Sequence, residues 1–243
     1  MLGVVPFNAA MPTPRDTIFN QAFQTSEADF KTLLKAGLHP FTQIETEIPG
    51  QPHGPVSDSF KVTLARSNSQ GPCLFFVYQI RPGQHMVLST AEVNQRGSNA
   101  AATVMGNFYK AARLGQCTGI RVGAQEVGAY VWSRAGFKPD RNDWVQSVRR
   151  HIGKKLDRLN LQYPGAIPPA LQQNMREILK QDDPSGHWQI TDQRLPLPDG
   201  SKLGSALTVN IPWSGLCDFN DPACVARLER YTRVRHAPPT SIP

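Results

Sequence analysis

The chain has 243 residues, of which 40% are hydrophobic and 19% are charged. This is enough apolar material for a packed core, which excludes an intrinsically disordered chain. The net charge of +7 favours an anionic partner, such as nucleic acid, a phosphate-bearing cofactor or a membrane surface, without distinguishing among them. No apolar run approaches the ~20 residues that a transmembrane helix needs, so we expect a soluble protein that does not insert into a membrane.

The N-terminal third predicts one short helix followed by strands. Ser26 is placed to cap a helix that continues to Lys35 with its apolar side chains on one face. Alternating polarity predicts a half-buried strand over residues 60–64, and the continuous apolar run at 73–80 predicts a central strand. A third strand is expected over residues 86–93.

The pattern becomes helical after this strand. Apolar residues spaced by threes and fours predict a helix over residues 99–114, which Gly115 ends, and residues 120–122 predict a short strand. A second helix is expected over residues 127–135. The centre of the chain therefore has the order β-β-β-α-β-α, which is typical of an α/β protein.

The remaining sequence predicts a loop-rich extension. A basic helix is expected over residues 145–161, another helix ends near Lys180, a strand covers 207–209, and a last helix begins near Pro222. The basic residues of this part form two clusters, which we interpret as solvated helix faces. These are Arg149, Arg150, Lys154, Lys155 and Arg158, and then Arg227, Arg230, Arg233 and Arg235.

Cysteine and histidine spacing predicts no metal site. The four cysteines form no CxxC pair, and no histidine lies at zinc-finger spacing. Free thiols in a reducing compartment are the expectation, although Cys217 and Cys224 could be bridged in a secreted form.

The segment from Met86 to Pro139 carries a family resemblance. Residues 95–100 read Gln-Arg-Gly-Ser-Asn-Ala, residues 132–137 read Trp-Ser-Arg-Ala-Gly-Phe, and Gly115 ends the helix between them. In this order and spacing, the landmarks resemble the GNAT superfamily of N-acyltransferases. In that family a Q/R-x-x-G-x-G/A loop precedes a helix and a Y-x-x-x-G-F segment follows. The alternative is an α/β unit that has loops and glycines at similar positions but is not an acyltransferase.

A closer resemblance is to the GNAT-like domains of bacterial polymorphic toxins, effectors and prophage-linked proteins. It is carried by residues 108–110 and 128–137 and by the tail segments 203–207, 213–215, 221–222 and 227–231, and it covers about residues 60–139 and 187–231. The resemblance implies a protein that is cytoplasmic or secreted from a bacterium into a target cell. It also implies a central mixed sheet flanked by helices. Our predicted divisions are a lead-in with one short helix (1–58), an acyl-CoA-binding core (59–162) and a C-terminal extension packed on the core (163–243).

The family resemblance implies acetyl-CoA, or another acyl-CoA, as co-substrate. Backbone N–H groups of the loop and of the following helix would hold the pyrophosphate, because small residues allow close approach and the helix dipole favours negative charge. Ser98 stands where the family has its first glycine. The cofactor-binding candidates are Val93, Gln95, Arg96, Gly97, Ser98, Asn99, Ala100 and Trp132.

Acyl transfer needs a base for the amine, a donor for the thioester carbonyl and an acid for the leaving thiolate. The resemblance implies that backbone N–H groups near residues 91–93 polarise the carbonyl, and Glu92 is the candidate general base. The family's usual acid is a Tyr, but Trp132 stands at that position. Tyr130 is the candidate replacement, although it faces another side of the helix. The alternatives are a solvated Glu92 and a packing role for Tyr130.

Three hypotheses follow for the whole chain. The first is an N-acyltransferase that acts on an amine of a protein, an aminoacyl-tRNA or a small molecule. The second, motivated by Ser98 and Trp132, is a catalytically silent GNAT-like binding module. The third, motivated by the charge, is a phage protein that binds or modifies nucleic acid.

Overall fold

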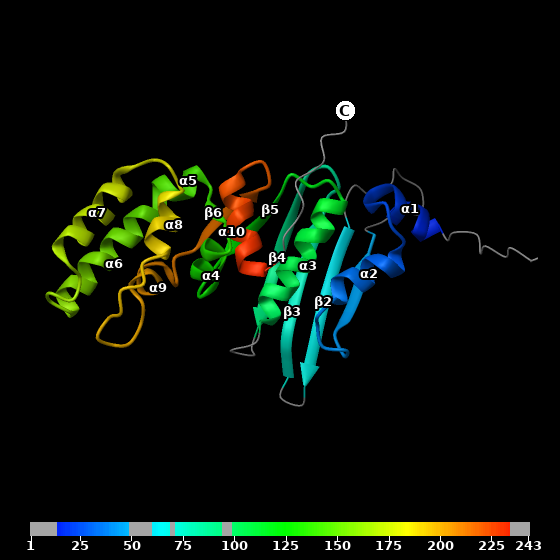
Figure 1. Cartoon of the computed structure of the whole chain (residues 1–243), viewed down its shortest axis with the longest axis horizontal. Helices are drawn as coiled ribbons and strands as arrows, with labels where there is room; N and C mark the ends of the chain where they lie inside the picture. Colours follow the sequence, from blue (N-terminus) through cyan, green and yellow to red (C-terminus); the bar gives the residue numbers. More distant parts are fainter. Residues whose placement is uncertain (1–13, 49–59, 69–70, 94–98, 234–243) are drawn as a thin grey trace, which may run out of the picture.

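The computed structural model of the chain describes residues 14–48, 60–68, 71–93 and 99–233. In this part of the chain a seven-stranded mixed sheet has the order β1-β2-β3-β4-β5-β7-β6 and is flanked by helices (Figure 1). The predicted α/β class is thus confirmed. The strands are β1 (Gln43–Glu47), β2 (Phe60–Asn68), β3 (Gly71–Ile80), β4 (His85–Val93), β5 (Gly119–Ala124), β6 (Lys138–Pro139) and β7 (Trp213–Asp218).

Strand pairing divides the sheet into two parts that meet at β4 and β5. Neighbours from β1 to β4 are antiparallel, as are the pairs β5–β7 and β7–β6, whereas β4 and β5 are parallel. Parallel neighbours need a crossover connection, and here the long helix α3 supplies it. The first helices are α1 (Pro14–Phe23), α2 (Glu27–Lys35), α3 (Ala100–Leu114) and α4 (Gly128–Arg134).

The chain between β6 and β7 makes a group of helices at one end of the molecule, away from β1 to β4 (Figure 1). The last helix, α10, returns to pack beside α3 and β7. These elements are α5 (Arg141–Asp143), the π-helical turn η1 (Trp144–Val148), α6 (Arg149–Gln162), α7 (Pro169–Lys180), α8 (Gly186–Thr191), α9 (Leu203–Thr208) and α10 (Pro222–Thr232).

Local sequence signals account for the elements that were predicted. The Ser26 hydroxyl accepts a hydrogen bond from the backbone N–H of Asp29 at 3.1 Å and so caps α2. Alternate residues of β2 and β3 are buried, including Val62 and Phe76, because one face of these strands lies against the helices. Helix α3 ends at Gly115, as expected.

Two expectations about the flanks are wrong. Residues 14–48 contain two helices and a strand rather than one short helix, because Phe19 and Phe23 lie one helical turn apart and are both fully buried. The extension is also not loop-rich, since its described part contains α7 to α10.

The expected strand at residues 207–209 is in fact the end of α9. Gly204 in this helix packs so closely on α8 that an added Cβ would lie 2.3 Å from the carbonyl oxygen of Thr191. The ammonium group of Lys155 donates to the carbonyl oxygens of Ala206 and Val209 at the helix end. Tertiary packing therefore overrides the β propensity of this short run.

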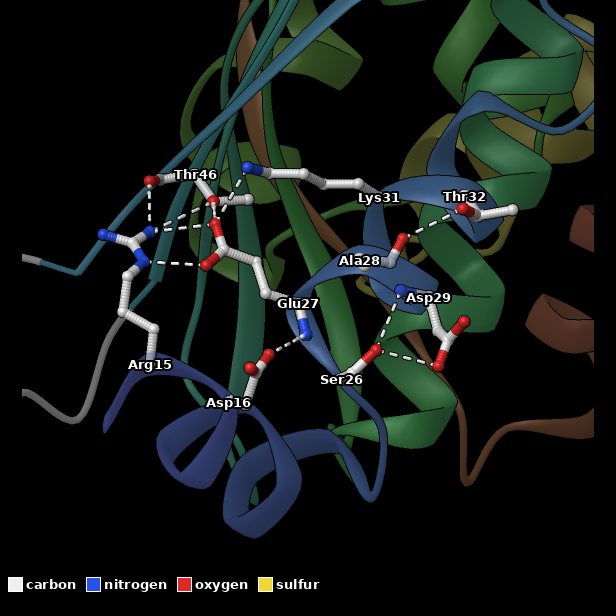
Figure 2. A network of polar contacts seen from close by, with 9 residues as sticks. All are labelled: Arg15, Asp16, Ser26, Glu27, Ala28, Asp29, Lys31, Thr32 and Thr46. Carbon is white, nitrogen blue, oxygen red and sulfur yellow. Dashed lines mark hydrogen bonds and ion pairs between the residues drawn. The ribbon is translucent and has the colours of Figure 1, made fainter. Parts of the chain in front are cut away.

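Ion pairs and hydrogen bonds connect α1 and α2 to each other and to β1. The Glu27 carboxylate accepts two hydrogen bonds from the Arg15 guanidinium, at 2.7 and 3.0 Å, and also contacts Lys31 and Thr46 (Figure 2). Arg15 donates in turn to the carbonyl oxygen of Thr46 at 2.9 Å. The hydrogen bond from Arg15, with further contributions from Lys31 and Thr46, lowers the pKa of Glu27 to about 2.

We expect Glu27→Gln to lower the free energy of unfolding at pH 7 by about 1–2 kcal/mol, a modest loss because Arg15 is half exposed. The carboxylate is ionised more readily in the folded than in the unfolded chain. Its contribution is therefore complete above the ordinary pKa of 4.5 and is lost as the pH falls towards about 2. Urea denaturation at several pH values measures this. Glu47→Gln, which removes an exposed pair with Lys61, is the control and should cost under about 0.5 kcal/mol.

Candidate functional site

The parallel strands β4 and β5 diverge at their carboxyl ends. They pair from His85–Gly119 to Leu88–Val122, and both strands then continue without pairing to each other. The register with β3 shifts at the same place, which leaves Ser89 as an extra residue in β4. A β-bulge of this kind bends a strand and increases its twist. The bulge explains why β4 leaves β5 here, so that the end of β4 pairs on the β3 side only.

The chain passes from the end of β4 through residues 94–98 into α3. Asn99 is the N-cap residue of α3 and is exposed, but its side chain makes no capping hydrogen bond. The first turn consists of Ala100, Ala101 and Ala102, whose small side chains leave the backbone accessible. The free N–H groups of a helix N-terminus attract anions. This end of α3 can therefore hold a phosphate group.

The structure describes only part of the predicted cofactor loop. Gln95, Arg96, Gly97 and Ser98 lie outside the described residues. The backbone of Glu92 and Val93 is described, opposite Phe75 and Leu74 of β3, and leads directly towards this loop. The roles expected for these side chains stay predictions.

Helix α4 carries the two aromatic candidates on different sides. Trp132 is 7% exposed and packs edge-on against the ring of Phe137, with centroids 5.8 Å apart. Tyr130 is partly exposed, and its hydroxyl accepts a hydrogen bond from Arg134 at 3.3 Å. Trp132 thus has a packing role in this structure, while the Tyr130 hydroxyl lies at a partly exposed position beside Arg134.

The turn after α4 has a structural reason for its glycine. Gly136 has a φ of +102°, and an added Cβ would lie 2.6 Å from the carbonyl oxygen of Cys224 in α10. Phe137 is fully buried behind it. The Gly136-Phe137 turn therefore packs against α10 directly after α4. This contact is between residues that are distant in the sequence.

A shallow depression of about 210 Å³ lies at the carboxyl end of β5, beside the candidate site. Asp143 supplies its carboxylate, one oxygen of which accepts the backbone N–H of Ser214 at 2.6 Å. Sequence reasoning missed this feature because its residues come together only through the pairing of β5 with β7. They are Gly123, Ala124, Gln125, Asp143, Pro212, Trp213 and Ser214.

Backbone strain occurs at the rim of this depression. Glu126 and Asn210 both have positive φ values, of 48° and 61°, and the N–H of Asn210 donates to the carbonyl oxygen of Glu126 at 2.9 Å. Such conformations are uncommon in residues other than glycine and cluster at functional sites. The loop after β5 is thus held in one shape by the segment before β7.

Among the described residues, no group of three or more His, Cys, Asp or Glu side chains is arranged to hold a metal ion. No helix in the same part of the chain is long and apolar enough to cross a membrane. Comparisons with protein-family models, with curated proteins and with solved structures found no match for the chain. The function of the site has to follow from its own geometry and chemistry.

Proposed function

We propose that the chain is an acyl-CoA-dependent N-acyltransferase of the GNAT type, which transfers an acetyl group from acetyl-CoA to an amine. One observation carries the proposal: β4 and β5 run parallel, stop pairing after Leu88 and Val122, and are connected by α3. Ligands of α/β proteins bind at the carboxyl ends of such strands, and the free N–H groups of α3 suit a pyrophosphate.

The diverging strands also offer backbone groups for the thioester. Beyond Leu88 the backbone of β4 pairs only with β3, so N–H groups on its other edge, near residues 91–93, can donate to a carbonyl oxygen that becomes negative. Glu92 is our proposed base for the attacking amine. As the new C–N bond forms and the C–S bond breaks, the leaving thiolate takes a proton from the Tyr130 hydroxyl or from water, since Trp132 is not an acid.

The acceptor follows from the family resemblance alone and is an amine on a protein, an aminoacyl-tRNA or a small molecule. A bacterial effector, toxin or prophage-linked protein, acting in the cytoplasm or in a target cell, is the proposed setting.

Calorimetric titration with acetyl-CoA tests the cofactor site first. We expect a dissociation constant in the micromolar range, and no binding at millimolar acetyl-CoA would reject the proposal. Asn99→Asp should weaken binding by about tenfold or more, because it places a negative charge beside the pyrophosphate. The same change should leave the stability unaltered or slightly raised, since Asp is a good N-cap. Asn99→Ser, a neutral cap, is the matched control and should bind nearly as the wild type does.

Measuring the rate of acetyl transfer distinguishes an active enzyme from a catalytically silent binding module. If Glu92 is the base, Glu92→Gln keeps acetyl-CoA affinity and lowers the rate of acetyl transfer by about 10²-fold or more. The readout is the mass of acetylated products after incubation with lysine peptides, polyamines and cell extract. Binding without transfer to any amine would favour the silent module.

A second candidate function, nucleic-acid binding, is favoured by one observation on α6. Arg150, Lys154 and Arg158 are spaced by four residues, are all exposed, and make no ion pair with any described residue. They form a basic stripe on one helix face. Three such cations suit the phosphates of a nucleic-acid backbone.

Fluorescence anisotropy with a random-sequence DNA duplex at several salt concentrations tests this stripe. Replacing Arg150, Lys154 and Arg158 together with Gln should lower the slope of log affinity against log salt by about 2–3 if the stripe binds phosphates. Arg176→Gln is the control, because this side chain already pairs with Asp157 at 2.6 Å. An unchanged slope in the triple variant would show that α6 is a solvated face.

A further inference from the structure

Two cysteines on different elements meet in the interior beside the sheet. Cys217 lies on β7 opposite Ile120, and Cys224 lies in the first turn of α10. Both are fully buried, the Cys224 thiol donates a hydrogen bond to the Asp221 carboxylate at 3.3 Å, and the two thiol groups lie close enough for each to shift the pKa of the other. Six residues separate them in the sequence. The turn between β7 and α10 is therefore sufficient to bring the two sulfur atoms close together.

The backbone around Cys224 is held in place from several sides. The Asp221 carboxylate caps α10 by accepting the N–H groups of Ala223 and Cys224, at 2.9 and 3.4 Å, and it pairs with the Lys138 ammonium at 2.8 Å. The close approach of Gly136 to the Cys224 carbonyl oxygen fixes the helix from the other side. The sulfur pair is therefore set up by the fold itself and does not depend on mobile side chains.

The environment makes the two thiols unequal. The interaction with Cys217 lowers the pKa of Cys224 and outweighs burial and the Asp221 carboxylate, which both raise it. The same interaction and burial raise the pKa of Cys217. In the folded chain Cys224 is therefore the thiol that deprotonates more readily. Cys117 provides a contrast within the chain, because it is buried with its thiol near the carbonyl oxygen of Arg81, and burial raises its pKa to about 11.

We propose that Cys217 and Cys224 are a site of disulfide formation by exchange with a low-molecular-weight disulfide such as oxidised glutathione. When α10 has left the sheet, the thiolate of either cysteine attacks one sulfur of the reagent, forms a mixed disulfide and releases one glutathione thiolate, which takes up a proton. The thiolate of the other cysteine then attacks the sulfur of the first and releases the second glutathione in the same way. The protein loses two protons and two electrons, and these convert one oxidised glutathione into two reduced molecules.

Burial determines when this exchange takes place. The reagent reaches the pair only when α10 leaves the sheet, so the bridge forms readily during folding and slowly in the folded chain. In a reducing compartment the pair stays as two thiols, and in an oxidising one the bridge fastens α10 to β7. The bridge should raise the melting temperature by about 5 °C, because it closes a short loop in the unfolded chain.

Peptide mapping of the full chain tests the proposal. The protein is refolded in oxidised or in reduced glutathione, unfolded in the presence of an alkylating reagent and digested with trypsin. Both cysteines fall in one tryptic peptide, residues 203–227. In the oxidised sample we expect this peptide to be unalkylated and two hydrogen masses lighter. In the reduced sample it should carry two alkyl groups, while Cys117 is alkylated in both samples.

Two results would overturn the inference. One is full alkylation of residues 203–227 after refolding in oxidised glutathione, and the other is a bridge from either cysteine to Cys73 or Cys117. Cys217→Ser and Cys224→Ser should each abolish both the mass change and the rise in melting temperature. The wild-type peptide map decides the question even if one of these variants fails to fold. A matched Cys117→Ser variant should keep the bridge.

Discussion

Gly215→Ala should destabilise the protein by about 3 kcal/mol or more, the largest effect that we expect from one added methyl group. Gly215 lies in β7 next to β6, and a Cβ at this position would be 2.1 Å from the carbonyl oxygen of Lys138 and 2.6 Å from the ring of Trp213. The first of these is a backbone atom in the paired strand, so β6 and β7 must separate to make room. The free energy of unfolding from urea denaturation measures the loss.

Gly123→Ala is a matched control for this change. Gly123 lies in β5 and pairs with Ser214, the neighbour of Gly215 in β7. An added Cβ at Gly123 would meet nothing within 4 Å. We expect the stability to change by less than about 0.5 kcal/mol. Equal losses at Gly215 and Gly123 would show that the close approach of β6 to β7 is not the cause.

The second large effect is the pH dependence that His187 imposes. This side chain is fully buried between Trp144 and Trp213, and neither ring nitrogen has a hydrogen-bond partner among the described residues. Burial lowers its pKa from 6.5 to about 3. Between these pH values the unfolded chain binds a proton that the folded chain does not. Stability should therefore fall by about 2 kcal/mol as the pH drops from 6.5 to 4.5.

His187→Leu should remove this pH dependence. At pH 7 the variant should also be more stable by about 1 kcal/mol, because it removes two buried ring nitrogens without partners. Urea denaturation at pH 7, 6, 5 and 4.5 measures both effects. These pH values lie above most of the range in which Glu27 titrates. His151→Gln, at an exposed position on α6, is the control and should keep the wild-type slope. A wild-type slope in His187→Leu would show that other groups cause the dependence.

Much of the fold could be predicted because its signals are local. Ser26 caps α2 by accepting the backbone N–H of Asp29, three residues further on, and Gly115 ends α3. The continuous apolar run of β3 predicts a central strand without knowledge of the neighbouring strands. The order of elements from β2 to α4 follows from such signals. The position of Asn99 and Ala100 at the start of α3 was likewise available from the sequence, because helix periodicity begins there.

Other features depend on partners that are distant in the chain. The strand β1 has the polar sequence Gln-Ile-Glu-Thr-Glu and forms because β2 pairs with it, whereas residues 207–208 belong to a helix because α8 packs on Gly204. Short segments of this kind have no decisive preference of their own.

The same division applies to the sites. The amino-acid sequence by itself determined the β-α-β-α order of the candidate acyl-CoA site and its Gly-Phe landmark. Only the tertiary structure decided that β4 leaves β5 at Ser89, that α10 packs on Gly136, and that Cys217 meets Cys224. The physical reason is that helix caps and periodicity act over a few residues. A bulge, a close backbone approach and a thiol pair exist only after the whole chain has packed.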